Sequence, residues 1–124
     1  PAEPPPDRQL LGHSTWTMLH KMVGKYPAEP TQEERRDMAT FFRLLGEFYP
    51  CDECAGHFRG MLEATPVDGA TRSNTDLHAW LCARHNQVNV RLGKPEFPCD
   101  PEVLEDRWGG CGCAEATEDA EAAP

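Results

Sequence analysis

The sequence predicts an all-α protein, a four-helix bundle with a short fifth helix near its C-terminal end. Three observations lead to this prediction. Apolar residues recur at three- and four-residue spacings, as on one face of a helix, and capping or helix-ending residues separate these stretches. No segment alternates apolar and polar residues as a half-buried strand does. Amphipathic helices with short connections bury their apolar faces against one another, which gives a bundle.

The chain has 124 residues, which is the size of one domain. We expect an extended Pro-rich leader over residues 1–9, a helical domain over 10–108 and a flexible tail over 109–124. The formal net charge of −9 disfavours nucleic acid as a partner, because phosphate binding needs lysine and arginine. No apolar run approaches the roughly 20 residues needed to span a bilayer, so no membrane partner is expected.

The first two helices have clear sequence signals. Trp16, Leu19 and Val23 share one helical face within a helix expected over residues 10–26. The segment Thr31-Gln32-Glu33-Glu34 is a capping box, in which the threonine and glutamate side chains pair with backbone N–H groups that the first turn leaves free. A second helix is therefore expected to begin there.

Three further helices follow. Pro50 disfavours a helical conformation at the residue before it and suits the first helical position, so we expect the third helix to begin at Pro50. A fourth helix is expected after a cap at Ser73 or Asn74 and should end at Gly93. The fifth helix is short and ends near Trp108.

The segment Cys51-Asp52-Glu53-Cys54 is the main candidate for chemistry. Both sulfur atoms would lie in the first turn of a helix, where unpaired backbone N–H groups stabilise a thiolate. A zinc half-site is an alternative, although the second ligand pair that such a site needs is incomplete in this sequence. A thioredoxin-type site is disfavoured because it belongs to a βαβ context.

The six cysteines form an even set that favours an oxidising compartment. Cys82 and Cys99 bracket the turn that follows the fourth helix. A disulfide that closes this loop would contribute roughly 3 kcal/mol to stability. We therefore expect this pair to be structural.

Cys111-Gly112-Cys113 lies in the tail. Strained and exposed disulfides are the labile ones, so this pair is expected to shuttle oxidising equivalents. The alternative is that the two cysteines attach the tail to the body of the protein or to another chain.

From periodicity alone, Trp16, His20 and His85 are core-packing residues, and no Gly-rich phosphate loop accompanies them.

Taken together, these segments resemble the Erv/ALR family of FAD-dependent sulfhydryl oxidases, over about Arg8 to Trp108. The order of the segments is far more specific than a single CxxC motif. The segments that carry the resemblance are Leu11-Gly12-His13-Ser14-Thr15-Trp16 with His20, Phe48-Tyr49-Pro50-Cys51-Asp52-Glu53-Cys54, Trp80-Leu81-Cys82, His85-Asn86-Gln87-Val88-Asn89, Leu92-Gly93-Lys94-Pro95 and Asp106-Arg107-Trp108.

The resemblance implies that FAD is held noncovalently in the mouth of the bundle and that the protein forms a homodimer. It implies that Cys54 faces the isoalloxazine ring, that Cys51 exchanges with the Cys111/Cys113 shuttle, and that Cys82 and Cys99 form the structural bridge. No metal is assigned. The residues implied to bind the cofactor are Arg8, Gly12, Trp16, His20, Tyr49, His85, Asn86, Val88, Asn89, Leu92, Lys94, Arg107 and Trp108.

The implied reaction is a thiol–disulfide relay that ends on FAD. A dithiol protein substrate or an import oxidoreductase would supply the electrons, and oxygen, yielding hydrogen peroxide, or cytochrome c would accept them. The implied compartment is the mitochondrial intermembrane space, with the endoplasmic-reticulum lumen as the alternative. A zinc-stabilised interaction module and a disulfide-braced binding domain are the competing hypotheses.

Overall fold

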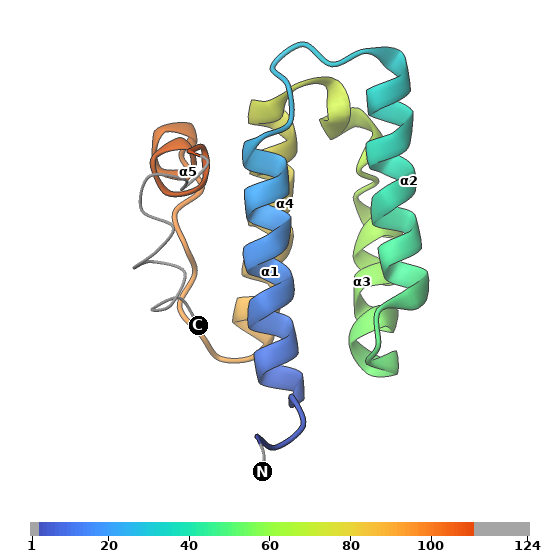
Figure 1. Ribbon diagram of the computed structural model, residues 1–124, viewed down its shortest axis with the longest axis vertical. Coiled ribbons are helices and arrows are strands. Elements are labelled where there is room, and N and C mark those ends of the chain that lie inside the picture. The colour runs from blue at the N-terminus through green and yellow to red at the C-terminus, as the bar shows by residue number, and fades with distance from the viewer. Residues whose placement is uncertain (1–2, 111–124) are drawn as a thin grey trace.

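The computed structural model describes residues 3–110, and this part of the chain contains five α-helices and one 3₁₀ helix but no strand. The prediction of an all-α fold is confirmed (Figure 1). In chain order the elements are α1 (Arg8–Gly24), α2 (Gln32–Phe48), α3 (Asp52–Ala64), η1 (Asp68–Arg72), α4 (Asn74–Arg91) and α5 (Pro101–Trp108). The segment with Cys111 and Cys113 lies outside the described residues.

The four long helices form two pairs. Helix α1 packs against α4 and α2 packs against α3, while the short helix α5 lies across the outer side of the α1–α4 pair (Figure 1). Aromatic contacts join the two pairs, since the rings of Phe42 in α2 and Trp80 in α4 meet edge to face. The residues that make up the buried core are Leu19, Val23, Tyr26, Ala39, Phe42, Phe58, Met61, Val67, Leu77, Trp80 and Leu81.

Side-chain caps start the first two helices. The capping box is present: the Thr31 hydroxyl accepts from the Glu34 N–H, and the Glu34 carboxylate accepts from the Thr31 N–H. Asp7 caps α1 by accepting from the N–H of Leu10 at 2.8 Å. Because of this cap the helix begins at Arg8, two residues before the expected start at residue 10.

The prediction that Pro50 is the first residue of the third helix was wrong. Helix α3 begins at Asp52, and Cys51 is its N-cap residue, with extended backbone angles (φ −147°, ψ 104°). The Sγ atom of Cys51 takes the place of the usual capping oxygen and accepts from the N–H of Cys54 at 3.4 Å. The Cys51 sulfur is thus part of the N-terminal cap of α3.

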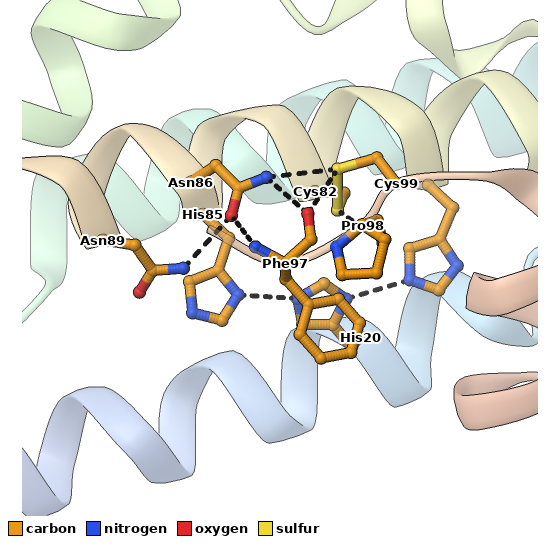
Figure 2. Close-up of a disulfide and its surroundings, with 9 residues drawn as sticks. His20, Cys82, His85, Asn86, Asn89, Phe97, Pro98 and Cys99 are labelled. Atoms are coloured by element: carbon orange, nitrogen blue, oxygen red, sulfur yellow. Dashed lines mark hydrogen bonds between the residues drawn. A yellow bond between two sulfur atoms is a disulfide. The ribbon is translucent and has the colours of Figure 1, made fainter. Parts of the chain in front are cut away.

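Helix α4 and the segment that follows it are tied together. Ser73 caps α4 by accepting from the N–H of Asp76. A disulfide joins Cys82 in α4 to Cys99, with an S–S distance of 2.07 Å and a Cα–Cα distance of 5.8 Å (Figure 2). These are the two cysteines that the sequence analysis assigned to a structural bridge. The connection between α3 and α4 contains η1.

No helix within residues 3–110 combines the length and apolar character that crossing a membrane requires.

Candidate functional site

The dithiol at the start of α3 is the first part of the site. The Sγ atoms of Cys51 and Cys54 lie 2.6 Å apart, and both side chains are partly buried. The hydrogen bond between the two sulfur atoms, the N–H of Cys54 and the charge of Arg8 together lower the pKa of Cys51 below its ordinary value. The pKa of Cys54 is raised, chiefly by its hydrogen bond with Cys51 and by burial. In the reduced pair Cys51 is therefore the thiol that ionises more readily.

Three predicted cofactor-binding residues lie near this dithiol. Arg8 forms an exposed ion pair with Glu53 at 3.1 Å. Its positive charge acts to lower the pKa of both cysteines. Burial raises the pKa of Tyr49, and the neighbouring cysteines add to this effect. Gly12 in α1 faces the Tyr49 hydroxyl, which would lie 4.0 Å from a Cβ atom at that position. The start of α1 and the end of α2 thus enclose the dithiol end of the site.

Two pairs of stacked rings form the second part of the site. Trp16 and His85 stack with centroids 4.1 Å apart and an angle of 3° between their planes. Trp108 of α5 stacks on His20 with centroids 4.7 Å apart. Such stacking is worth about 0.5–1.5 kcal/mol beyond the burial of area. Helices α1, α4 and α5 therefore each contribute a planar ring to one cluster.

A hydrogen-bonded histidine lies at the centre of this cluster. Nε2 of His20 lies 2.9 Å from Nδ1 of His85, and Nδ1 of His20 lies 2.9 Å from Nε2 of His78 (the His20–His85 pair is labelled in Figure 2). Burial lowers the pKa of His20 to about 3 and those of His78 and His85 to about 4. At neutral pH all three rings are uncharged.

Asn86 holds the chain segment that precedes α5. Its Nδ2 donates to the carbonyl of Phe97 and its Oδ1 accepts from the N–H of Phe97, both at 2.8 Å (Figure 2). Asn89 donates to the same Oδ1 at 3.2 Å, and its carbonyl accepts from the N–H of Lys94. Both ends of the Asn86 amide thus bind the protein's own backbone, and the two asparagines fix the path of the segment between α4 and α5.

The other predicted cofactor-binding residues lie at the edge of the cluster. The Arg107 guanidinium lies 4.7 Å from the ring of Trp108, and the charge of Lys94 helps to lower the pKa of His85. Val88 packs against the core, whereas Leu92 is 60% exposed. Two positively charged side chains, Arg107 and Lys94, thus lie near the aromatic rings.

Two residues of this site were not among those predicted to bind the cofactor. His78 lies seven residues before His85, and this spacing places both on one face of a helix, so periodicity could have found it. Thr15 lies beside Trp16 in the chain, and a hydrogen bond with Thr15 acts to lower the pKa of Tyr49. Thr15 therefore connects the dithiol end of the site with the aromatic end.

Within residues 3–110 no group of three or more histidine, cysteine or carboxylate side chains is arranged to hold a metal ion. Paired thiols with opposite pKa shifts at a helix start instead suit thiol–disulfide exchange. Uncharged rings that stack, with cations beside them, suit a planar ligand that carries negative charge.

A helical bundle with a polarised dithiol and a cluster of stacked rings defines a class of α-helical thiol-redox proteins. Comparison with known proteins makes this more specific. The model of the Erv1/Alr family matches residues 13–109, and the chain belongs to this family.

The most informative relatives agree with this assignment. "FAD-linked sulfhydryl oxidase ERV1" of Oryza sativa subsp. japonica is 40% identical over 117 residues, which cover 94% of this chain and 58% of that protein. "Mitochondrial FAD-linked sulfhydryl oxidase ERV1" of Saccharomyces cerevisiae is 38% identical over 104 residues, covering 84% and 53%. The chain spans about half the length of the curated relatives it matches.

Solved structures show the same fold. The crystal structure of the yeast Erv1 core has a TM-score of 0.82 and 36% sequence identity, and the match covers 89% of this chain and 91% of that one. The crystal structure of the FAD-binding domain of Erv1 from Saccharomyces cerevisiae gives a TM-score of 0.79 at 35% identity, covering 85% and 96%. The helical arrangement is therefore that of the Erv1 core.

Proposed function

We propose that this chain is a FAD-linked sulfhydryl oxidase that forms disulfide bonds in protein substrates. The observation that carries the proposal is the Cys51–Cys54 pair, whose sulfur atoms lie 2.6 Å apart at the start of α3 with opposite pKa shifts. Sulfur atoms this close need little movement to form and break a disulfide. The family's relatives from rice, Arabidopsis thaliana and yeast carry the name FAD-linked sulfhydryl oxidase.

The two cysteines have different roles in the proposed reaction. A thiolate of a small dithiol, or of the reduced shuttle pair Cys111/Cys113, attacks the Cys51 sulfur of the disulfide, forming a mixed disulfide and releasing Cys54 as a thiolate. The second thiol of the attacking pair then displaces Cys51, and that pair leaves as a disulfide. While Cys51 is in the mixed disulfide, the hydrogen bond that most raises the pKa of Cys54 is absent. Cys54 is then able to remain ionised, as an electron donor must be.

The aromatic cluster fits a flavin dinucleotide. Trp16 and His85 offer planar stacking surfaces, and Lys94 and Arg107 offer positive charge for a diphosphate. Bound FAD would supply the two-electron acceptor that a thiol pair lacks. The residues that we assign to cofactor binding are Arg8, Gly12, Trp16, His20, Tyr49, His85, Asn86, Val88, Asn89, Leu92, Lys94, Arg107 and Trp108.

The remaining cysteines complete the proposed relay. Cys111 and Cys113 would receive electrons from the substrate and pass them to Cys51 and Cys54, because a CxC pair forms a strained and readily exchanged disulfide. Overall, two thiols lose two electrons and two protons, and one oxygen molecule gains both to give hydrogen peroxide. Two molecules of cytochrome c, each taking one electron, are the alternative acceptor, with release of the two protons.

We assign a dithiol protein or an import oxidoreductase as the substrate. We propose the mitochondrial intermembrane space as the compartment, supported by the relative named mitochondrial in yeast, with the endoplasmic-reticulum lumen as the alternative. Six cysteines in a chain of this length suit either oxidising compartment.

The proposed assembly is a homodimer. Leu44 and Phe48 lie four residues apart on α2 and so share one helix face, where they are 50% and 78% exposed. Large apolar side chains on one exposed face suit burial against a second copy. Phe48→Glu should convert a dimer to a monomer in light scattering. A monomeric wild-type protein would contradict this assignment.

The central experiment measures the cofactor and the activity together. The purified full chain should show flavin absorbance and consume oxygen in the presence of dithiothreitol, with one hydrogen peroxide formed per disulfide. Cys54→Ser should keep the flavin and lose oxygen consumption. Glu63→Gln, an exposed change on the same helix, should keep both. A folded protein without flavin would refute the proposal.

A second experiment tests the shuttle. The double variant Cys111→Ser, Cys113→Ser should oxidise dithiothreitol at the wild-type rate but oxidise a reduced protein substrate more slowly. A small dithiol reaches Cys51 directly, whereas a protein substrate needs the shuttle pair. Equal rates on both substrates, relative to wild type, would show that the pair is not a shuttle.

A further inference from the structure

Three histidines form one continuous hydrogen-bonded chain. His78 bonds to His20 through Nε2 and Nδ1, and His20 bonds to His85 through Nε2 and Nδ1, each at 2.9 Å. His20 and His78 are 2% and 4% exposed. His85 ends the chain on one side, where its ring stacks on Trp16.

The two hydrogen bonds must run in the same direction. An uncharged imidazole has one N–H donor and one acceptor nitrogen, and burial keeps all three rings uncharged at neutral pH. If His20 donates to His78, it must accept from His85, and the reverse also holds. The hydrogen-bond partner at the His78 end of the chain therefore decides which nitrogen of His85 carries the proton.

The charges around the His85 end are positive. Lys94 acts to lower the pKa of His85, and Arg107 acts in the same way on His20. A nearby cation attracts the lone pair of a ring nitrogen and repels an N–H group. This favours an unprotonated Nε2 on His85, with the proton on Nδ1 and directed to His20.

The charged residues around the His78 end are negative. His78 lines a cavity of about 510 Å³ between α4 and α5. The lining contains no lysine or arginine, and its acidic residues are Glu102, Glu105 and Asp106. Carboxylates attract an N–H group, so Nδ1 of His78 is the favoured site for its proton. Both ends thus favour the direction from His85 through His20 to His78.

We propose that His78 is a positioning residue for the flavin site: by accepting a hydrogen bond from His20 it holds His85 in the tautomer whose Nε2 is a free acceptor. The tautomer itself does not depend on the proposed function, but its role in binding FAD does. His85 then presents an acceptor that suits an N–H or O–H donor of the ligand and rejects a carbonyl group. His78 acts through His20, and its ring is not part of the Trp16–His85 stack.

The first test needs no variant. Nitrogen-15 NMR of the flavin-loaded full chain with labelled histidine distinguishes a protonated from an unprotonated ring nitrogen. We expect the proton on Nδ1 in His20, His78 and His85 at pH 7. A protonated Nε2 on His85 would overturn the proposal.

The second test changes His78. His78→Leu keeps a similar volume but cannot accept the proton of His20, so the chain should reverse and move the proton of His85 to Nε2. FAD binding should weaken about tenfold, which is about 1.4 kcal/mol. His78→Gln supplies an amide oxygen as acceptor and should restore the wild-type tautomer, with FAD affinity within about twofold.

The outcomes separate this inference from the proposed function. A purely structural role for His78 would lower the melting temperature of His78→Leu without moving the proton of His85, and that result would refute the proposal. If the wild-type chain binds no flavin, the proposed function and the flavin role of His78 both fail, although the tautomers are still measurable. If flavin binds normally to His78→Leu while the tautomer reverses, only the positioning role fails.

Discussion

Gly24, the last residue of α1, lies directly against the carbonyl group of Trp108 at the end of α5. A Cβ atom on Gly24 would overlap the carbonyl oxygen of Trp108. The missing side chain lets α5 approach closely enough for the Trp108 ring to stack on His20. The size of residue 24 therefore controls the position of one wall of the candidate site.

This contact predicts opposite effects for two glycine substitutions. Gly24→Ala should destabilise the protein by about 1–3 kcal/mol, because backbone atoms of α5 must move to admit the methyl group. Gly60→Ala in α3 meets nothing within 4 Å and should stabilise by about 0.5–1 kcal/mol, since alanine favours the helix. Urea unfolding measures both. Equal stabilisation by the two changes would show that α5 does not press on Gly24.

The hydrogen bond within the dithiol predicts the pKa of Cys51. In Cys54→Ala the largest cause of the lowered pKa is lost, so the pKa of Cys51 should rise toward its ordinary value. Cys54→Ser keeps a hydroxyl donor at the same position and should keep the pKa of Cys51 lower than Cys54→Ala does. The pH dependence of iodoacetamide alkylation measures the difference. The idea fails if both variants give the same pKa.

The ion pair beside the dithiol predicts shifts of opposite sign. Arg8→Gln removes a nearby positive charge and should raise the pKa of Cys51, whereas Glu53→Gln removes a negative charge and should lower it. Both groups are more than half exposed, so the shifts should shrink at 1 M salt, where the Debye length is about 3 Å. The same alkylation assay serves here, and shifts that persist in high salt would point to a change of structure.

The disulfide predicts a loss of stability when it is removed. The double variant Cys82→Ala, Cys99→Ala should lose roughly 3 kcal/mol in urea unfolding, because the bridge closes a loop with a sequence separation of 17. A strong reductant should lower the stability of the wild type by a similar amount and leave that of the variant nearly unchanged. A reductant effect of equal size on both proteins would assign the stabilisation to other cysteines.

Local signals in the sequence were enough to predict most helices. The capping box at Thr31 and Glu34 forms as expected, and the cap at Asp7 could have been read from its residue type. The start of α3 could not, because a cysteine sulfur rarely acts as a cap and proline at the preceding position favoured an earlier start. The N-terminal turn at Cys51 depends on the sulfur atom itself.

The candidate site was only partly predictable for a different reason. Helix periodicity identifies which residues share a face, but the register between α1 and α4 decides which histidine nitrogens meet. The spacing of His78 and His85 places both on one face of α4, but only the register between the helices shows that His78 meets His20. The role of Asn86 could not be predicted for the same reason. Its two hydrogen bonds with the Phe97 backbone depend on the path of a loop that has no regular structure.

The buried histidines predict that stability falls as the pH drops below about 6.5. The pKa values of His20 and His78 are lowered from 6.5 to about 3 and about 4, so the unfolded chain binds protons in this range while the folded chain does not. Stability is highest above pH 6.5, and between pH 7 and pH 5 each of these histidines should cost about 2 kcal/mol at most.

Urea unfolding of the flavin-loaded protein at pH 7 and pH 5 measures this loss. His78→Gln should lose less between the two pH values than the wild type, because one lowered pKa is gone. His57→Gln, at an exposed position on α3, is the matched control and should follow the wild type. The range ends at pH 5 because carboxylates begin to protonate below it. A wild-type stability that is flat from pH 7 to pH 5 would mean that the histidine chain accepts a proton in the folded state.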